Sequence, residues 1–279
     1  MKFEDLNPKE NPEHYWDYLG YMEASAIEKN NDTIKPWDET AKKCMTLAIL
    51  APLLKGEKSS EESVKLAAAF LKRSMTDFRS IWLMLNWGYP YQAACVASSL
   101  YENSLVVNCI VDSDDLARTV MNAKNGDIPW GAQKLAKMAA EKDLMGKITD
   151  KPENSKEYEQ AWKLCYRNYK WLCKIKHPTI QQLNDETNHS KVDDGRFAVI
   201  PLPDTRESGV GLKQMIMIIA VSRLFSAAKN FAMAIKCPDD DKDHIKFFSL
   251  TCEVFSELKD NISKSSIKDL PIQVYDYKI

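Results

Sequence analysis

The chain has little glycine and little of the alternation between apolar and polar residues that marks β-strands. Nine glycines occur in 279 residues, and the one strand-like stretch is RFAVIPLP at 196–203. Hairpin turns depend on glycine, and strands depend on β-branched and aromatic alternation, so both shortages argue against a β architecture.

The chain also lacks a recognisable metal or disulfide motif. Its seven cysteines are an odd number and form no Cys-x-x-Cys pair, and most lie on apolar helix faces, where cysteine behaves as a small hydrophobe. The acidic run Asp239–His244 follows a proline at a helix start and has no glycine at the sixth position of a calcium loop. We therefore expect a reduced chain with no metal and no cofactor.

Neither strong net charge nor a long uninterrupted apolar run is present. The formal net charge is −2, which gives no global attraction to nucleic acid or to an anionic membrane, so any such attraction needs a local patch. The N-terminal residues show no apolar signal segment. The most apolar run, Gln214–Ile235, is interrupted by Arg223, Lys229 and Asn230, which is unusual for a transmembrane helix. We expect a cytoplasmic protein with no membrane partner.

What the sequence has in quantity is helix signals. Capping residues, prolines at helix starts and apolar residues at helical spacing predict nine helices. The predicted ranges are 11–30, 36–55, 59–88, 90–111, 114–123, 129–144, 155–176, 209–236 and 239–263. The predicted fold is an all-α bundle of long antiparallel helices, with a small irregular or β-ribbon insertion near 181–204. We interpret 1–279 as a single all-α domain, with its weakest boundary near 146–154.

Three local features give the helix ends. Gly88 is expected to turn the chain between two long helices, and Gly56 to end the preceding helix in a left-handed conformation. Ser59 and Glu62 have the spacing of a capping box.

Five side chains with a positive or titratable group follow the helix predicted at 155–176. Lys163, Arg167, Lys170, Lys174 and His177 succeed one another at steps of four, three, four and three residues, which places them along one stripe. The first four are candidate nucleic-acid contacts, since aligned cations suit a phosphate backbone. The alternative is a solvated face that complements the helix dipole.

His177 is a candidate catalytic residue. It lies where the helix is expected to stop, because Pro178 disfavours helical conformation at the preceding residue. A histidine there can act as a general acid or base, or it can simply bond the last carbonyls of the helix.

Glu102 is a second catalytic candidate, together with Lys170. It lies in the apolar helix ACVASSLYENSLVVNCI, where we expect burial over much of the circumference. A buried carboxylate needs a cation or several hydrogen bonds, so Arg167, Lys170 or His177 is its expected partner. Either a structural buried pair or an active carboxylate satisfies that requirement.

Two stretches carry a resemblance to known proteins. GYPYQAACVASSLYE at 88–102 and YKWLCKIKHP at 169–178 resemble two motifs, G-x-x-x-A…L-x-E and Y-x-x-L-x-x-x-x-H-P, of an uncharacterised bacterial all-helical family. Ser98 and Cys173 stand where that family has arginine and serine.

More distantly, the arrangement resembles the HEPN helical bundles of bacterial toxin and antiphage systems. That resemblance implies a metal-independent ribonuclease in which His177 acts on the ribose 2′-hydroxyl. Lys170 or Arg167 would then stabilise the charge that develops on the phosphate. It also implies a homodimer, which apolar helices can support.

Three functions remain open from the sequence. The first is a non-catalytic helical interaction or regulatory protein of a bacterial stress or antiphage defence system. The second is the HEPN-like ribonuclease or toxin, which uses His177 and the adjacent basic stripe. The third is a pocket between helices that binds a small ligand. The expected partner is accordingly RNA or another protein.

Overall fold

The computed structural model describes residues 14–144, 155–177, 179–190, 201–265 and 267, and every regular element in these ranges is helical. The predicted all-α class is therefore confirmed. The ten α-helices of these ranges are α1 His14–Ile34, α2 Asp38–Leu50, α3 Glu62–Asn86, α4 Pro90–Ile110, α5 Asp114–Met121, α6 Ala132–Leu144, α7 Lys156–Lys176, α8 Ile180–His189, α9 Val210–Ile235 and α10 Lys242–Lys264. Short 3₁₀ helices at Lys35–Trp37, Ala51–Leu53, Lys124–Gly126 and Glu207–Gly209 join some of them.

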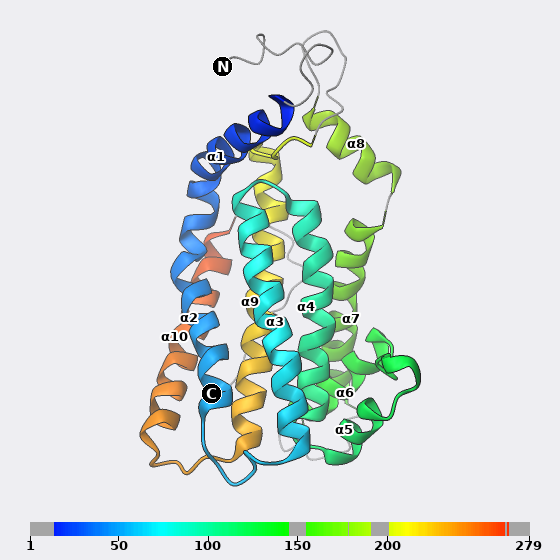
Figure 1. The fold of residues 1–279 in the computed structure, drawn as a ribbon, viewed down its shortest axis with the longest axis vertical. Coiled ribbons are helices and arrows are strands. Elements are labelled where there is room, and N and C mark those ends of the chain that lie inside the picture. The colour runs from blue at the N-terminus through cyan, green and yellow to red at the C-terminus, as the bar shows by residue number, and fades with distance from the viewer. Residues whose placement is uncertain (1–13, 145–154, 178, 191–200, 266, 268–279) are drawn as a thin grey trace.

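Three long helices form the centre of the bundle. α3, α4 and α9 contact one another, α2 and α10 cover one side, and α6 and α7 cover the other (Figure 1). α4 and α9 are buried around most of their circumference, which explains why their sequences are apolar on nearly every face.

One helix among the described residues, Glu207–Ile235, is long and apolar enough to cross a membrane by length and composition alone. It packs inside the bundle against α2, α3 and α4.

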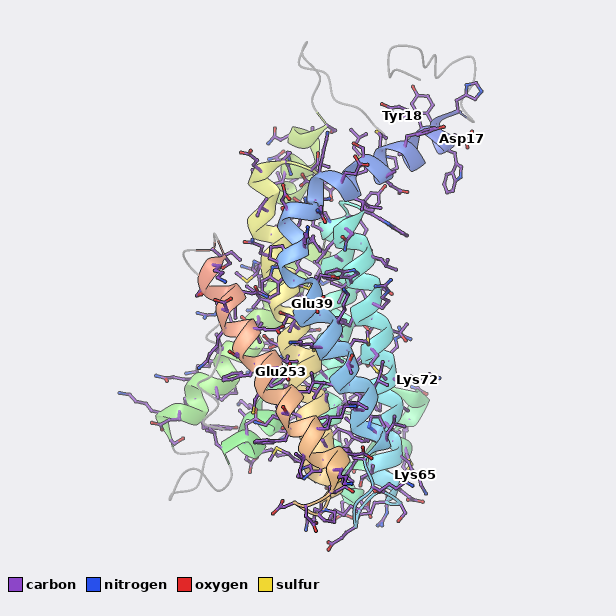
Figure 2. All side chains as sticks on the ribbon, turned by 90° about the vertical axis from the view of Figure 1, so that its left-hand side faces the viewer. Asp17, Tyr18, Glu39, Lys65, Lys72 and Glu253 are labelled. Carbon is purple, nitrogen blue, oxygen red and sulfur yellow. The ribbon has the colours of Figure 1, made fainter. Side chains whose placement is uncertain are left out.

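α10 lies against α2 on the face shown in Figure 2. Lys43 of α2 contacts Glu253 at 2.9 Å and also pairs with Glu257, and Thr40 donates a hydrogen bond to Glu257 at 3.0 Å. Phe247, Val254 and Leu258 supply the apolar side of the contact, and all three are buried. These polar and apolar contacts hold the last described helix to the second.

The turn between α3 and α4 is as predicted. Gly88 has φ +83°, and Pro90 occupies the first turn of α4. A Cβ atom at Gly88 would lie 2.9 Å from Cβ of Pro203, so only glycine fits both the conformation and the space.

Two other predicted helix ends were wrong in detail. Gly56 is not left-handed; a Cβ there would lie 2.4 Å from the carbonyl oxygen of Ile235, so glycine is required by the close approach of α9. Ser59 does not cap α3, because its Oγ accepts a hydrogen bond from the backbone N–H of Gly56 at 2.7 Å. The backbone N–H of Ser63 instead donates to Asp114 at 3.3 Å.

The segment near 181–204 differs from the prediction where the structure describes it. Residues 180–189 form α8, residues 201–206 have no regular structure, and most of RFAVIPLP lies outside the described residues. The described part contains no β-ribbon.

The boundary suggested near 146–154 also lies outside the described residues. One apolar core includes buried residues from both sides of it, from Ile34 to Leu258. The single-domain interpretation stays a prediction.

Candidate functional site

α7 carries most of the predicted site, and its bounds match the sequence prediction closely. Ser155 caps its start by accepting a hydrogen bond from the backbone N–H of Tyr158 at 3.0 Å. The backbone N–H of His177 donates to Cys173 at 3.0 Å at the other end, and His177 leaves the helical conformation at φ −85°, ψ 138°. The buried side of α7 packs on α4 and α6, which directs the opposite side to solvent.

The basic row of α7, defined here as Lys163, Arg167, Lys170 and Lys174, is exposed along its whole length. Lys163 pairs with Glu159 one turn earlier. The ammonium of Lys170 lies 5.8 Å from the ring centre of Tyr166. Solvent-exposed pairs of this kind contribute little to stability.

Glu102 is not buried, in contrast to the prediction. Its side chain is exposed, and it accepts a hydrogen bond from the hydroxyl of Tyr169. Burial and the neighbouring carboxylate raise the pKa of Tyr169, so the phenol stays protonated and acts as the donor. The apolar residues around Glu102 misled the sequence analysis, because α4 still leaves a narrow strip at this position uncovered.

The structure does not bring Glu102 to His177. Tyr169 is the residue that meets Glu102, and His177 follows it by about 12 Å along the axis at roughly 1.5 Å per residue. The side chain of His177 is exposed at the helix end. Lys170 lies next to Tyr169 in sequence and is also exposed.

A buried polar cluster that the sequence analysis missed lies between the loop before α9 and α1. Asp204 is 2% exposed, and its carboxylate accepts two hydrogen bonds from the Arg206 guanidinium, at 3.0 and 2.8 Å. Lys213 is 1% exposed and donates to the backbone carbonyl of Asp204 at 2.6 Å and to the side-chain oxygen of Asn30 at 2.7 Å. The backbone N–H of Asp204 donates to Gly88 at 2.7 Å.

Burial and charge act against each other in this cluster. Burial works to raise the pKa of Asp204, but hydrogen bonds from Arg206 outweigh it and the pKa is lowered. Burial lowers the pKa of Lys213, and Asp204 opposes that change. One signal of the cluster was available in the sequence: Lys213 stands near the start of a mostly apolar helix.

A pocket of about 720 Å³ opens between this cluster and the end of α7. α4, α7, α8 and the segment that leads into α9 all contribute to its wall. The lining side chains include two aromatic rings, two cations and an exposed carboxylate; they are Tyr91, Trp171, Lys174, Arg206 and Asp185. Lys174 belongs both to the basic row and to this pocket.

Within the part of the chain that the structure describes, no group of three or more histidine, cysteine, aspartate or glutamate side chains is arranged to hold a metal ion. All seven cysteines are free thiols. Burial raises the pKa of Cys109 to about 12, which makes this thiol unreactive at neutral pH.

No protein-family model, no curated protein and no solved structure matches this chain.

Proposed function

We propose that the chain is a non-catalytic helical interaction or regulatory protein, acting in the cytoplasm of a bacterium within a stress or antiphage defence system. One observation supports the non-catalytic choice most directly. The carboxylate of Glu102 accepts a hydrogen bond from the Tyr169 hydroxyl, two helical turns before His177, which argues against Glu102 and His177 acting together as an acid–base pair. The placement in a defence or stress system rests on the motif resemblance at 88–102 and 169–178.

The basic row of α7 is the proposed contact surface. Its four cations are exposed on one face of a helix whose other face packs on α4 and α6. A partner with an acidic surface fits this face, because complementary charge speeds association and selects the partner. A second copy of this chain is a further candidate partner. Its contact would use surface residues, because α4 and α9 are buried inside the bundle.

A pair of double variants tests this surface. Lys163→Gln with Lys170→Gln removes two charges from the row, and Lys65→Gln with Lys72→Gln removes two exposed charges at the same spacing on α3 (Figure 2). The complexes that the parent forms in its host cell should be lost with the α7 variant and kept with the α3 variant. If both variants keep the same partners, the row is not the contact surface.

The alternative function is a metal-independent HEPN-like ribonuclease or toxin. It is favoured by the exposure of His177 and of the nearby Lys170 and Lys174, because exposed side chains are accessible to an RNA strand. In that case His177 would act on the 2′-hydroxyl and Lys170 on the phosphate, while Glu102 would position Tyr169.

Incubation of the parent and of His177→Ala with total RNA, in the presence of a chelator, separates the two functions. The non-catalytic proposal expects no fragmentation by either protein. Fragmentation by the parent that is lost in His177→Ala would replace it with the ribonuclease.

A further inference from the structure

The pocket beside the end of α7 lies next to the proposed contact surface and shares Lys174 with it. Its volume of about 720 Å³ lies within the range of roughly 300 to 1,000 Å³ that is typical of small-ligand sites. Four segments that are far apart in the sequence enclose it: the start of α4, the end of α7, α8 and the approach to α9.

The polar cluster at the base of the pocket holds two cations, buried Lys213 and half-buried Arg206, against one buried carboxylate, that of Asp204. Arg206 pairs with the buried carboxylate of Asp204, and Lys213 donates to the backbone carbonyl of the same residue. Lys174 adds another cation at the rim. Because a buried charge without a counter-charge is unfavourable, an anion that enters the pocket and contacts Arg206 would be stabilised there.

Arg206 retains hydrogen-bonding capacity for such an anion. Among the described residues, it donates to both carboxylate oxygens of Asp204 and, at 3.4 Å, to the backbone oxygen of Asp185. These contacts use three of the five N–H donors of a guanidinium. Asp204 fixes the orientation of the side chain, so the remaining donors are preorganised.

The other walls suit a planar ring and hydroxyl groups. Trp171 and Lys174 are three residues apart and lie on the same face of α7, which places an aromatic surface beside the cation. Tyr91 contributes a second ring from α4. The carboxylate of Asp185 is exposed at the rim and can accept hydrogen bonds from sugar hydroxyls.

We propose that this pocket binds a mononucleotide. Its phosphate contacts Arg206 and Lys174, its base packs on Trp171 or Tyr91, and its ribose hydroxyls face Asp185. Of the four residues of the basic row, Lys174 alone lines the pocket, so the two proposals share this one side chain.

Isothermal titration calorimetry of the full chain tests the proposal with six probes: the four ribonucleoside monophosphates, adenosine and inorganic phosphate. At least one monophosphate should bind about ten-fold more tightly than adenosine and than inorganic phosphate, since charge and ring contacts both contribute. Lys174→Met should weaken that binding by about ten-fold, the expected loss of one charge-assisted contact. Lys156→Met removes an exposed charge at the other end of α7 and should leave binding within about two-fold of the parent.

Three results would overturn the proposal: no monophosphate binds, inorganic phosphate binds as tightly as every monophosphate, or Lys156→Met weakens binding as much as Lys174→Met. Trp171→Leu should remove the preference for a monophosphate over inorganic phosphate. Trp171 packs partly on the core, so the circular dichroism spectrum of Trp171→Leu is first compared with that of the parent to show that the variant folds. Lys174 is exposed, so its variant keeps the test decisive if Trp171→Leu does not fold.

Discussion

At the scale of single residues, the molecule depends on a few polar side chains that are held in place by long-range contacts. Asp204 joins Arg206, Lys213 and the turn at Gly88 through its side chain and both of its backbone groups. None of these partners is fixed by local helix geometry. The cluster therefore forms only when the surrounding helices have packed.

Asp204→Asn should therefore destabilise the protein by about 3 kcal/mol at neutral pH, because it leaves two buried or half-buried cations without a counter-charge. Urea unfolding followed by circular dichroism measures the change. Asp185→Asn, at the exposed rim of the same pocket, is the control and should change stability by less than about 0.5 kcal/mol. Equal effects of the two substitutions would contradict the importance of the buried cluster.

The same carboxylate gives a pH dependence with a definite sign. The folded-state pKa of Asp204 is lowered from 3.8, so its stabilising contribution is present above that value and is lost as the pH falls through the folded-state pKa. The difference in unfolding free energy between the parent and Asp204→Asn should shrink as the pH falls below about 3.8. A difference that stays constant from pH 6 to pH 2 would exclude this origin.

Replacement of Gly88 and of Gly20 by alanine should change the free energy of unfolding in opposite directions. In Gly88→Ala, the alanine must adopt the left-handed conformation of this turn, and its Cβ comes into close contact with Pro203. The substitution should lower the free energy of unfolding by about 1 to 3 kcal/mol. Gly20 lies within α1 with no atom within 4 Å of an added Cβ. Gly20→Ala should stabilise the helix by about 0.5 to 1 kcal/mol. Thermal unfolding of the two variants would show both directions.

At the scale of elements, helices with local start signals were predicted best. Ser155 caps α7 as the sequence indicates, and α7 begins and ends within one residue of the predicted bounds. α3 differs, since Ser59 turns back to Gly56 and the cap at Ser63 comes from Asp114 of α5. A cap supplied by another helix leaves no local spacing for sequence analysis to detect.

Ser155→Ala should cost about 1 kcal/mol, the usual contribution of an N-cap side chain. Ser263→Ala, at an exposed position near the end of α10, is the comparison and should stay within about 0.5 kcal/mol of the parent. Chemical denaturation of both variants and of the parent at one pH measures the two changes in the free energy of unfolding. A loss at Ser263 as large as that at Ser155 would show that the cap is not the cause.

At the scale of the whole molecule, stability should be distributed unevenly. α9 is buried on most sides by α2, α3 and α4, whereas α8 exposes Ile180 and Leu183 and stands at the edge of the bundle (Figure 1). Local opening is easiest where few apolar contacts must be broken.

Native-state hydrogen exchange should accordingly find the slowest amides in α4 and α9 and much faster exchange in α8. Mass spectrometry of peptides from each helix gives the comparison. If a mononucleotide binds in the pocket, exchange in α8 should slow on its addition while exchange in α10 stays unchanged. Protection of α8 equal to that of α9 in the free protein would contradict this distribution.

The sequence by itself determined the all-α class, the number and order of the long helices, and the alignment of the basic row along one stripe of α7. These follow from apolar periodicity, caps and glycine turns, which act over a few residues. Only the tertiary structure decided that Glu102 meets Tyr169, and that Asp204, Arg206 and Lys213 gather beside a pocket under α8. Glu102 and Tyr169 lie on separate helices, and the Asp204 cluster joins the segment before α9 to α9 itself and to the turn at Gly88. The free energy of these contacts depends on burial that appears only when the helices pack.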